Sequence, residues 1–480
     1  MDEVILIQSK VGDWDKVRSH PSLPLALLSS ARLVAKEFKT ILIDTRIERS
    51  WRRRLRRLLE KKPLCVGLTS ITGRQIHYAL EISKFIKQFS KVPIIWGGIH
   101  ASLLPESTLE NPNIDILVIG EGEETFLELV KALKEKRNLK DIAGIWYKER
   151  GVLLANKSRP FVDLNTLAPL PLDIIKINNY LPVFKGRRTF YIETARGCPN
   201  QCGFCYNSAY NKNRWRAFDA RRVVEEIKYL YKTYNISSFY VIDDNTFVDT
   251  KRALAIARGI IDEKLDVYLE FQGISISSAM KFDDQDLELL VRAGMKKVHF
   301  GIESASERIL KSVNKRLNID HVLEVNKRWS RHDVRVQYNF MCGFPGETRE
   351  DIRKTVELIF RLMKDNRNSL ISPLCPFTPY PGTALYDQAI EDGFLHKKKL
   401  EDWSRSDYGD DIWDSVKRKK FLSRLFFASM FLDVHRSKDM VQSPILKLLI
   451  DLYRPLAKFR VKHLFFRGML ELKIKNLLFR

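Results

Sequence analysis

Residues 195–207, which read ARGCPNQCGFCYN, constrain this chain more than any other stretch. Three cysteines, Cys198, Cys202 and Cys205, fall within eight residues there, with the spacing C-x3-C-x2-C. The apolar and β-branched run at 189–194 directly precedes them and predicts a strand, so the thiols lie on a loop at a strand end. Soft thiolates are the usual ligands of iron–sulfur clusters. Such a loop can hold three irons of a [4Fe–4S] cluster and leave the fourth iron open.

Two other interpretations of the loop stay open from the spacing alone. A structural zinc site normally has four protein ligands, and no cysteine or histidine of fitting spacing follows nearby. A disulfide would pair two of the thiols and leave one over. The remaining cysteines, Cys65, Cys342 and Cys375, lie singly in apolar runs and are expected to be reduced core residues.

The cysteine spacing, with the aromatic Phe204 just before the last cysteine, resembles the radical SAM superfamily. In that family S-adenosylmethionine chelates the open iron, and an electron from the cluster cleaves it to a 5′-deoxyadenosyl radical. The resemblance implies that Cys198, Cys202 and Cys205 are the cluster ligands. It also implies an enzyme that receives electrons from a reductant protein such as flavodoxin or ferredoxin.

Length and composition agree with a globular enzyme. The chain has 480 residues, of which 45% are hydrophobic and 29% charged, enough for two or three domains. The first residues do not read as a signal peptide, and no apolar run reaches the roughly 20 residues of a membrane span. We therefore expect a cytoplasmic protein, because a reducing compartment suits an oxygen-sensitive cluster.

Residues 1–150 alternate short apolar runs with helical patterns. The runs lie at 4–7, 41–44, 65–68, 93–96 and 116–119, and helical segments such as Leu25–Glu37 and Arg74–Phe89 lie between them. This alternation predicts a doubly wound, Rossmann-like parallel sheet, in which ligands bind beyond the carboxyl ends of the strands. The loops expected there, at 69–73, 97–102 and 120–124, carry small hydroxyl residues, paired glycines and acidic residues.

This N-terminal half resembles the cobalamin-binding domain that precedes many radical SAM domains. In that domain a serine region is followed, about a helix later, by a Gly-Gly pair, and Ser70 and Gly97–Gly98 have this layout. The resemblance implies that cobalamin contacts the strand-end loops. The residues assigned to it are Thr69, Ser70, Thr72, Gly97, Gly98, His100, Gly120 and Glu121. A Rossmann-like domain without a ligand would show the same alternation.

One motif departs from the family pattern. Many cobalamin domains carry D-x-H-x-x-G, whose histidine is the lower axial ligand, but residues 44–49 read DTRIER here. Arg46 stands in the place of the histidine, and a guanidinium stays protonated and cannot ligate cobalt. We therefore expect a lower face without a protein histidine. His77 and His100 are the other nearby candidates, and we expect both to be ordinary polar residues.

Residues 188–400 repeat the strand–helix alternation after a proline-containing linker at 151–187. Six strands are expected, at 189–194, 238–243, 267–272, 297–302, 334–341 and 372–378. A set of six alternating strands resembles the partial (β/α)6, TIM-like barrel of radical SAM enzymes. These enzymes place their chemistry at the C-terminal strand ends. The resemblance assigns S-adenosylmethionine to Phe204, Tyr206, Asp243, Asp244, Glu303, Ser304, Gly343 and Gly346. A strand-end aspartate is often only a helix N-cap, and that alternative stays open for Asp243 and Asp244.

Residues 401–480 are helical, aromatic and basic. The whole chain has a net charge of +23, and its last 70 residues hold 16 Lys and Arg against 6 Asp and Glu, a net charge of +10. One apolar face comprises Ile445, Leu448, Leu449, Leu452 and Tyr453. A basic amphipathic helix of this kind is typical of a membrane interface, and a helical lid on the barrel is the alternative. Nucleic acid is disfavoured as a partner, because the apolar stretches exceed what a phosphate-tracking surface needs.

The sequence thus predicts an α/β fold with a Rossmann-like cobalamin domain, a partial barrel and a helical C-terminal region. In the methylating branch of the family, methylcobalamin donates a methyl group to the carbon that the radical activates. We expect C-methylation of a lipid-like or membrane-associated substrate. The alternative is a radical oxidation, cyclisation or carbon–carbon coupling without methyl transfer. A membrane-bound scaffold with a vestigial cluster is the third, non-enzymatic possibility.

Overall fold

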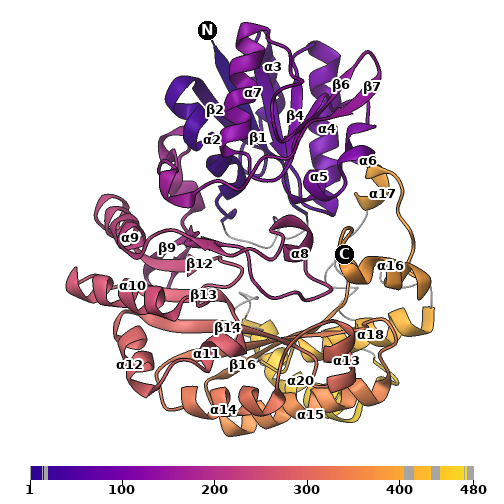
Figure 1. The fold of residues 1–480 in the computed structure, drawn as a ribbon. Helices are drawn as coiled ribbons and strands as arrows, with labels where there is room; N and C mark the ends of the chain where they lie inside the picture. Colours follow the sequence, from indigo (N-terminus) through magenta and orange to yellow (C-terminus); the bar gives the residue numbers. More distant parts are fainter. Residues whose placement is uncertain are drawn as a thin grey trace.

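Two seven-stranded sheets, one in each half of the chain, dominate the structure. The structure is a computed structural model that describes residues 2–12, 15, 20–404, 416–433, 444–469, 471 and 472. Figure 1 shows the N-terminal sheet above and the second sheet below, with the cysteine-loop segment between them. None of the described helices is long and apolar enough to cross a membrane.

The N-terminal sheet has the strand order β2-β1-β3-β4-β5-β6-β7. Its strands are β1 (Glu3–Gln8), β2 (Lys39–Asp44), β3 (Cys65–Thr69), β4 (Ile94–Gly97), β5 (Ile116–Val118), β6 (Ile145–Glu149) and β7 (Val152–Ala155). The first five are parallel, and β6 and β7 add an antiparallel hairpin. The order reverses between β1 and β3, and sheets of this kind bind ligands at such a switch point.

Helices cover both faces of this sheet because successive strand side chains point to opposite faces. Leu6 packs in a core with residues of α2 (Leu25–Glu37) and α7 (Glu123–Glu135), whereas Ile5 packs with residues of α3 (Trp51–Leu59) and α4 (Arg74–Phe89). The short helices α5 (Ile99–Leu103) and α6 (Pro105–Leu109) follow β4. The Rossmann-like fold predicted from the alternation is confirmed.

The connector between the two sheets is ordered but has little regular structure. It contains the 3-10 turns η1 (Leu164–Thr166), η2 (Leu172–Ile174) and η3 (Ile177–Tyr180). The hydroxyl of Tyr180 donates a hydrogen bond of 3.0 Å to Asp44 at the end of β2, which fastens the connector to the first sheet. The β6–β7 hairpin crosses residue 150, and the predicted domain boundaries at 150, 187 and 400 stay predictions.

The second sheet has the order β16-β15-β14-β13-β12-β9-β8. Its parallel strands are β9 (Arg187–Ile192), β12 (Ile236–Val241), β13 (Tyr268–Ile274), β14 (Met295–Glu303), β15 (Arg335–Cys342) and β16 (Ser369–Pro376), and β8 (Val183–Phe184) pairs antiparallel with β9. The sheet stays open between β16 and β8, so the predicted partial barrel of six parallel strands is confirmed.

Helices on the outer face of this sheet form one layer, as Figure 1 shows. They are α9 (Ala220–Tyr234), α10 (Thr250–Asp262), α12 (Asp284–Arg292), α14 (Ile319–Trp329) and α15 (Arg349–Asp365). Phe300 of β14 packs edge-on against Trp329 of α14, with 5.4 Å between ring centroids. The alternate residues of the same strands therefore face the barrel interior.

The chain returns to the N-terminal domain after the last strand. Behind α16 (Ala384–Glu391), the short helix α17 (Leu400–Trp403) buries Leu400 and Trp403 in the core on the α3–α4 side of the first sheet. The amide of Asn111 donates a hydrogen bond of 2.6 Å to Glu401. This second contact holds the two sheets together at the side away from the connector.

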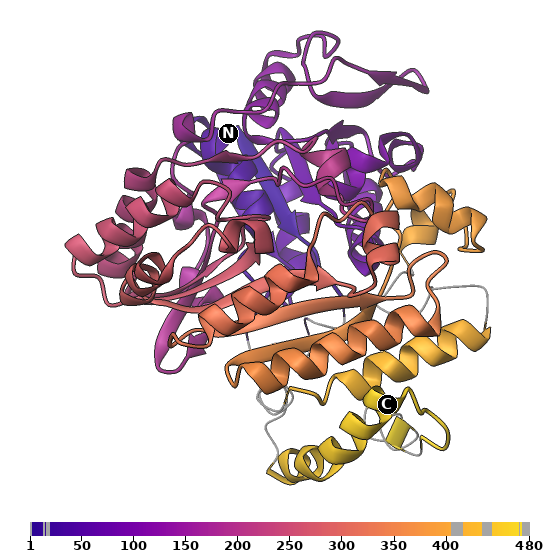
Figure 2. The ribbon, with the colours of Figure 1, turned by 60° about the horizontal axis from the view of Figure 1, so that its bottom comes forward.

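Two further helices cover the free edge of the barrel. Helix α18 (Val416–Ser429) packs along β16, where the Leu374 amide donates to the Ser429 hydroxyl at 2.9 Å. Helix α20 (Pro444–His463) packs against α15 and α18 and leaves one side outward (Figure 2). The rest of the predicted C-terminal region, at 405–415, 434–443, 470 and 473–480, lies outside the described residues.

Candidate active site between the two sheets

The cysteine loop leaves the C-terminal end of β9 and is held by a two-residue ladder of β10 (Ala195–Arg196) with β11 (Arg216–Ala217). Gly197 precedes the first cysteine and has a φ of +85°. A Cβ atom at this position would overlap the carbonyl oxygen of Arg214. Glycine is therefore required by both the backbone angle and the space, and the ladder fixes where Cys198 emerges.

The three loop thiols are soft donors of the kind that hold a [4Fe–4S] cluster. All of them are free and half-buried. No three His, Cys, Asp or Glu side chains in the described part of the chain converge as the ligands of a single ion would. Burial raises the pKa of the Cys202 thiol, and that of Cys205 to about 12, so iron would have to supply the charge that makes them thiolates.

Two aspartates that the sequence assigned to S-adenosylmethionine binding tie the cysteine loop to the end of β12. Asp243 is buried and accepts hydrogen bonds from the amide and hydroxyl of Thr194, at 2.6 and 2.5 Å. Burial raises the pKa of Asp243 to about 6. Asp244 accepts a hydrogen bond of 2.7 Å from the hydroxyl of Tyr206. Helix α10 has Asp249 as its N-cap, so neither predicted aspartate caps that helix.

A buried lysine–glutamate pair lies beside the last two cysteines. Glu303 ends β14 with a φ of +67°, and its carboxylate accepts a hydrogen bond of 3.1 Å from Lys315. The Lys315 ammonium lies 5.7 Å from the ring centroid of Phe204. Burial lowers the pKa of Lys315, but Glu303 and Cys202 outweigh it, so the lysine stays charged. The sequence reasoning missed Lys315 because a lone lysine in a loop carries no motif.

The other residues predicted for S-adenosylmethionine are distributed along the strand ends. Ser304 is buried and accepts a hydrogen bond of 3.1 Å from the Ser306 amide. Gly343 has a φ of +83°, and a Cβ atom there would lie 2.7 Å from Leu422 of α18. Gly346 has a φ of +66° and open space around it. Ser304 thus faces its own loop, while the two glycines shape the turn that follows β15.

A cavity of about 360 Å³ lies where the N-terminal sheet faces the barrel. Five of the eight residues predicted for cobalamin line it, namely Thr69, Gly97, Gly98, Gly120 and Glu121, and Arg196, Tyr206, Tyr210 and Asp244 line it from the barrel side. A Cβ atom on Gly98 would lie 2.6 Å from the Thr69 hydroxyl, whereas one on Gly120 would meet nothing within 4 Å. Gly98 therefore lets its loop pack closely on Thr69, whereas Gly120 leaves the backbone open beside the cavity, where part of a flat ligand such as cobalamin would fit.

The remaining three residues predicted for cobalamin, Ser70, Thr72 and His100, do not line this cavity. His100 is fully buried, with its Nδ1 3.0 Å from the Thr72 hydroxyl and its ring edge-on to Trp403 at 5.9 Å. Burial lowers the pKa of His100 to about 3, so the imidazole is neutral. These side chains support the strand-end loop from behind.

Arg46 also points away from the cavity. Its guanidinium pairs with Asp44 at 2.6 Å and donates a hydrogen bond of 2.8 Å to the Ser22 carbonyl. Among the described residues that line the cavity there is no histidine. The lower face without a protein histidine stays a prediction.

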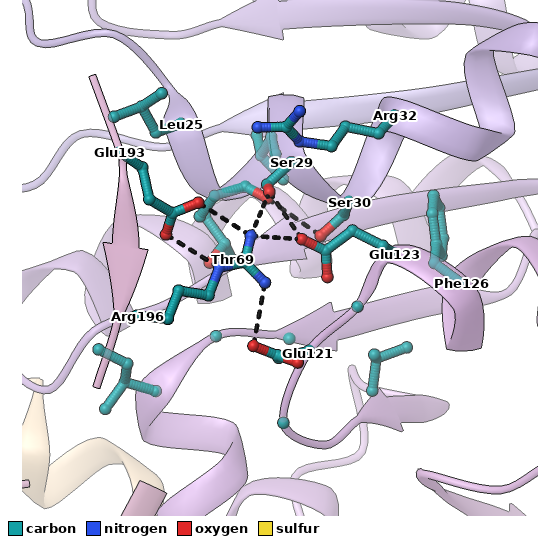
Figure 3. Close-up of a pocket in the computed structure, with 18 of the residues that line it drawn as sticks. Leu25, Ser29, Ser30, Arg32, Thr69, Glu121, Glu123, Phe126, Glu193 and Arg196 are labelled. Carbon is teal, nitrogen blue, oxygen red and sulfur yellow. Dashed lines mark hydrogen bonds and ion pairs between the residues drawn. The ribbon is translucent and has the colours of Figure 1, made fainter. Parts of the chain in front are cut away.

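A buried ionic cluster joins the two domains at the floor of the cavity (Figure 3). We call it the Arg196 cluster, and it comprises Arg196, Glu121, Glu123, Glu193 and Ser29. The guanidinium lies 3.0 Å from Glu121, 2.7 Å from Glu123 and 2.9 Å from Glu193. Arg196 stands two positions before the first cysteine, so the cluster connects the N-terminal loops directly to the cysteine loop. Glu121, predicted for cobalamin, is thereby engaged in this cluster.

A polar row runs across the interior face of the barrel. Strand register aligns Tyr191 with Tyr240, Tyr240 with Glu270, and Glu270 with Lys297. His299 lies 2.7 Å and Lys297 2.9 Å from the Glu270 carboxylate. These residues point away from the helices that cover the outer face. The interior is therefore suited to a substrate that carries hydrogen-bonding groups.

Comparison with known proteins matches each half of the chain to a family model. The model of the radical SAM superfamily matches residues 192–359, and that of the B12 binding domain matches residues 18–130. The chain is 33% identical to an uncharacterized methyltransferase of Pyrococcus horikoshii over 78% of this chain and 79% of the relative. The chain belongs to the cobalamin-dependent radical SAM family. The cofactors predicted from the sequence, a [4Fe–4S] cluster, S-adenosylmethionine and cobalamin, are those of this family.

Further relatives of this radical SAM enzyme carry different names. It is 27% identical to the anaerobic magnesium-protoporphyrin IX monomethyl ester cyclase of Rubrivivax gelatinosus over 80% of this chain and 68% of that protein. It shares its fold with the methyltransferase TsrM of Kitasatospora setae, with a TM-score of 0.67, 18% identity, and coverage of 81% and 75%. The radical enzyme OxsB gives a TM-score of 0.76, 17% identity, and coverage of 96% and 72%.

The Arg196 cluster should contribute strongly to the stability of this radical SAM enzyme. The R196Q variant leaves Glu123, which is 2% exposed, without its cation, and breaking such a buried pair costs about 3–5 kcal/mol. We expect a much lower midpoint of chemical denaturation, and weaker retention of cobalamin on gel filtration. R221Q is the matched control, because Arg221 pairs with Glu225 on the surface, where a pair contributes at most about 0.5 kcal/mol.

The pH dependence of this effect has a defined sign. Burial raises the pKa of Glu123, but Arg196 outweighs it and holds the pKa below its ordinary value. The difference in unfolding free energy between wild type and R196Q should thus be present at neutral pH and shrink as the pH falls through that lowered pKa. Equal stability of R196Q and R221Q at neutral pH would contradict the role of the cluster.

Substitution of Gly197 should disturb the cysteine loop selectively. In G197A the Cβ atom overlaps the Arg214 carbonyl, so Cys198 has to move. G186A is the matched control, since Gly186 also has a positive φ, +75°, but no atom within 4 Å of its Cβ position. We expect G186A to reconstitute to the wild-type iron content and G197A to retain less than half. Full iron content in G197A would rule out the proposed placement of the loop.

Cobalamin bound to this protein should lack a nitrogen ligand from the protein on its lower face. With cobinamide, which lacks the nucleotide base of cobalamin, electron paramagnetic resonance of the bound Co(II) form is expected to show no nitrogen superhyperfine splitting. The R46H variant should give the same spectrum, because residue 46 points toward Asp44 and away from the cavity. Nitrogen splitting in the wild-type protein would overturn this prediction.

Proposed function

We propose that this enzyme transfers a methyl group to an unactivated carbon of a lipid-like, membrane-associated substrate. The observation that carries the proposal is the shared cavity, which is lined by Thr69 and Gly98 of the B12-binding domain and by Arg196 and Tyr206 of the cysteine loop. A methyl carrier in this cavity would lie next to the site where the radical forms. When bound, the three cofactors supply reductive cleavage of S-adenosylmethionine and a methyl group carried on cobalt.

The residues of the chain would bind and orient these groups. Cys198, Cys202 and Cys205 would hold the cluster, and Glu303 with Lys315 offers charge-assisted hydrogen bonds to the polar groups of S-adenosylmethionine beside it. Asp243 and Asp244 would act by fixing the cysteine loop. Thr69, Gly97, Gly98 and Gly120 would hold cobalamin, with the Arg196 cluster beneath it.

The substrate is proposed to be an amphiphile. The polar row around Glu270 and His299 presents charged and hydrogen-bonding groups to the interior, whereas the outward side of α20 is apolar. A molecule with a polar head and a hydrocarbon portion satisfies both features. We also propose a peripheral location at the membrane and a small electron-transfer protein as the reductant.

A radical oxidation or cyclisation is the second candidate function. It is favoured by the similarity to the magnesium-protoporphyrin IX monomethyl ester cyclase of Rubrivivax gelatinosus. Methylation is favoured by the similarity to the relative in Pyrococcus horikoshii that is named a methyltransferase. Both reactions would use the same cavity, so the product has to decide between them.

The products of the reconstituted enzyme distinguish the two reactions. With membrane lipid extract, reductant and S-adenosylmethionine labelled in its methyl group, we expect label in the lipid fraction together with S-adenosylhomocysteine and 5′-deoxyadenosine. Formation of 5′-deoxyadenosine without label transfer would favour the oxidation or cyclisation. C202A should abolish cleavage, whereas C65A, which removes a buried core cysteine, should keep it. An active C202A protein with its cluster intact would refute the ligand assignment.

A further inference from the structure

One side chain outside the predicted site residues contacts the sulfur of a loop cysteine. Asn245 follows the two aspartates after β12, and its amide Nδ2 donates a hydrogen bond to the Sγ of Cys198 at 3.7 Å. Asn245 is buried, with 3% of its surface exposed. In the described part of the chain, no other side chain donates a hydrogen bond to a sulfur of Cys198, Cys202 or Cys205. Asn245 is therefore placed to act on a ligand of the cluster.

The backbone around Asn245 is fixed from both sides. The indole N–H of Trp215 donates a hydrogen bond of 2.8 Å to the Asn245 carbonyl. The next amide, that of Thr246, donates a hydrogen bond of 2.8 Å to the Gly273 carbonyl of β13. A Cβ atom on Gly273 would overlap the Asp244 carbonyl oxygen, so glycine is required for β13 to pack this closely. The fold of the barrel thus sets the place of the Asn245 side chain.

The orientation of the Asn245 amide suits a sulfur that carries negative charge. Its Oδ1 is buried and has no hydrogen-bond partner among the described residues, while its Nδ2 points at Cys198. An uncharged thiol is a weak acceptor. A hydrogen bond to an ionised acceptor is about twice as strong as one between neutral groups. The amide therefore gains most from this orientation when Cys198 is a thiolate on iron.

We propose that Asn245 raises the reduction potential of the cluster through its hydrogen bond to the Cys198 sulfur. On reduction, one electron passes from the reductant to the iron–sulfur group, no bond forms or breaks, and the sulfurs become more negative. An N–H group directed at one of these sulfurs stabilises the reduced form more than the oxidised form, and hydrogen bonds of this kind help to set such potentials. The inference rests on the cluster ligands of the proposed function, but not on methyl transfer or on the substrate.

The charged groups around the loop stay the same when Asn245 is replaced by a neutral residue. They are Lys315 with its partner Glu303, and Asp244, which accepts a hydrogen bond of 3.0 Å from the Gly197 amide. Leucine has the branching of asparagine but no N–H group. N245L thus removes the hydrogen bond to the sulfur and keeps the shape and the charge of the site. N245A removes the hydrogen bond and the volume together.

A redox titration monitored by electron paramagnetic resonance tests the proposal on the full-length protein loaded with its cluster and cobalamin. At a fixed potential we expect the ratio of reduced to oxidised cluster to fall roughly tenfold in both N245L and N245A, the effect of one hydrogen bond to a charged acceptor. For a one-electron couple this is a midpoint about 59 mV lower. Equal midpoints of N245L and wild type would overturn the proposal. A lower midpoint in N245A alone would show that Asn245 only fills space, which also overturns it.

N314G is the matched control. The Asn314 amide also donates a hydrogen bond to the cysteine loop, but it does so to the Gln201 carbonyl, at 2.9 Å, and not to a sulfur. Asn314 has a φ of +50°, which glycine adopts without strain, so the substitution removes only the side chain. We expect the wild-type midpoint in N314G. A midpoint as low as that of N245L would mean that both variants act through the position of the loop, which contradicts the role of the hydrogen bond to sulfur.

A measurement on the wild-type protein needs no substitution and covers the case in which N245L binds no cluster. Protein labelled with 15N at its asparagine side-chain amides is reduced and studied by pulsed electron paramagnetic resonance. Because Nδ2 of Asn245 donates to Cys198, we expect a 15N coupling to the electron spin of the cluster that unlabelled protein lacks. Labelled wild-type protein without this coupling would rule out the hydrogen bond.

Readouts on the same preparations separate this inference from the proposed function. They are the iron content, the midpoint potential and the transfer of labelled methyl groups. A lowered midpoint in N245L with no methyl transfer by wild type counts against the proposed reaction alone. An unchanged midpoint in N245L with methyl transfer by wild type counts against the role of Asn245 alone. A wild-type protein that takes up no iron overturns the cluster assignment on which both depend.

Discussion

The guanidinium of Arg196 is the interaction on which the relation between the two domains depends. It lies among Glu121, Glu123 and Glu193, and a buried charge of this kind is tolerated only when it is fully paired. Because Arg196 belongs to the cysteine loop and Glu121 and Glu123 follow β5, the two strand-end loops cannot shift independently. The Tyr210 hydroxyl adds a second link, a hydrogen bond of 2.9 Å to the Gly120 carbonyl. The cavity between the sheets is therefore preorganised by the protein itself.

The same constraint explains the chemistry of the cysteine loop. Its three thiols have to meet a cluster while the adjacent cavity holds a second large cofactor, so the backbone must be fixed without bulky side chains. Gly197 and the carboxylates of Asp243 and Asp244 do this from below, through backbone and hydroxyl hydrogen bonds rather than through ligands. Glu303 and Lys315 form a buried ion pair, so a carboxylate and an ammonium lie beside the cysteines. Orientation by the chain and reactivity from the cofactors are thus separate tasks.

Periodicity and motif spacing predicted the parallel strands of both sheets and the loop that carries the three cysteines, since these depend on local patterns of apolar residues. They could not predict how side chains at the strand ends pair. Glu121 reads as a loop residue free to meet a ligand, yet it engages Arg196 and Arg216 from the other domain. His100 reads as a possible ligand, yet it supports its loop from behind. Lys315 has no motif at all, and only the fold brings it to Glu303.

The polarity of the barrel interior limits what the enzyme can act on. Glu270 is held ionised by His299 and Lys297, although burial opposes this, so the row keeps charged and hydrogen-bonding groups at the interior face. A pure hydrocarbon placed there would strip these groups of water without offering partners, which is costly. A substrate with a polar head avoids that cost. Its unreactive carbon could then lie above the row, toward the strand ends, where the cysteine loop and the cavity between the sheets meet. The polar interior face and the cavity at the strand ends therefore set two separate demands on a substrate, hydrogen-bonding groups for the first and a carbon that reaches the second.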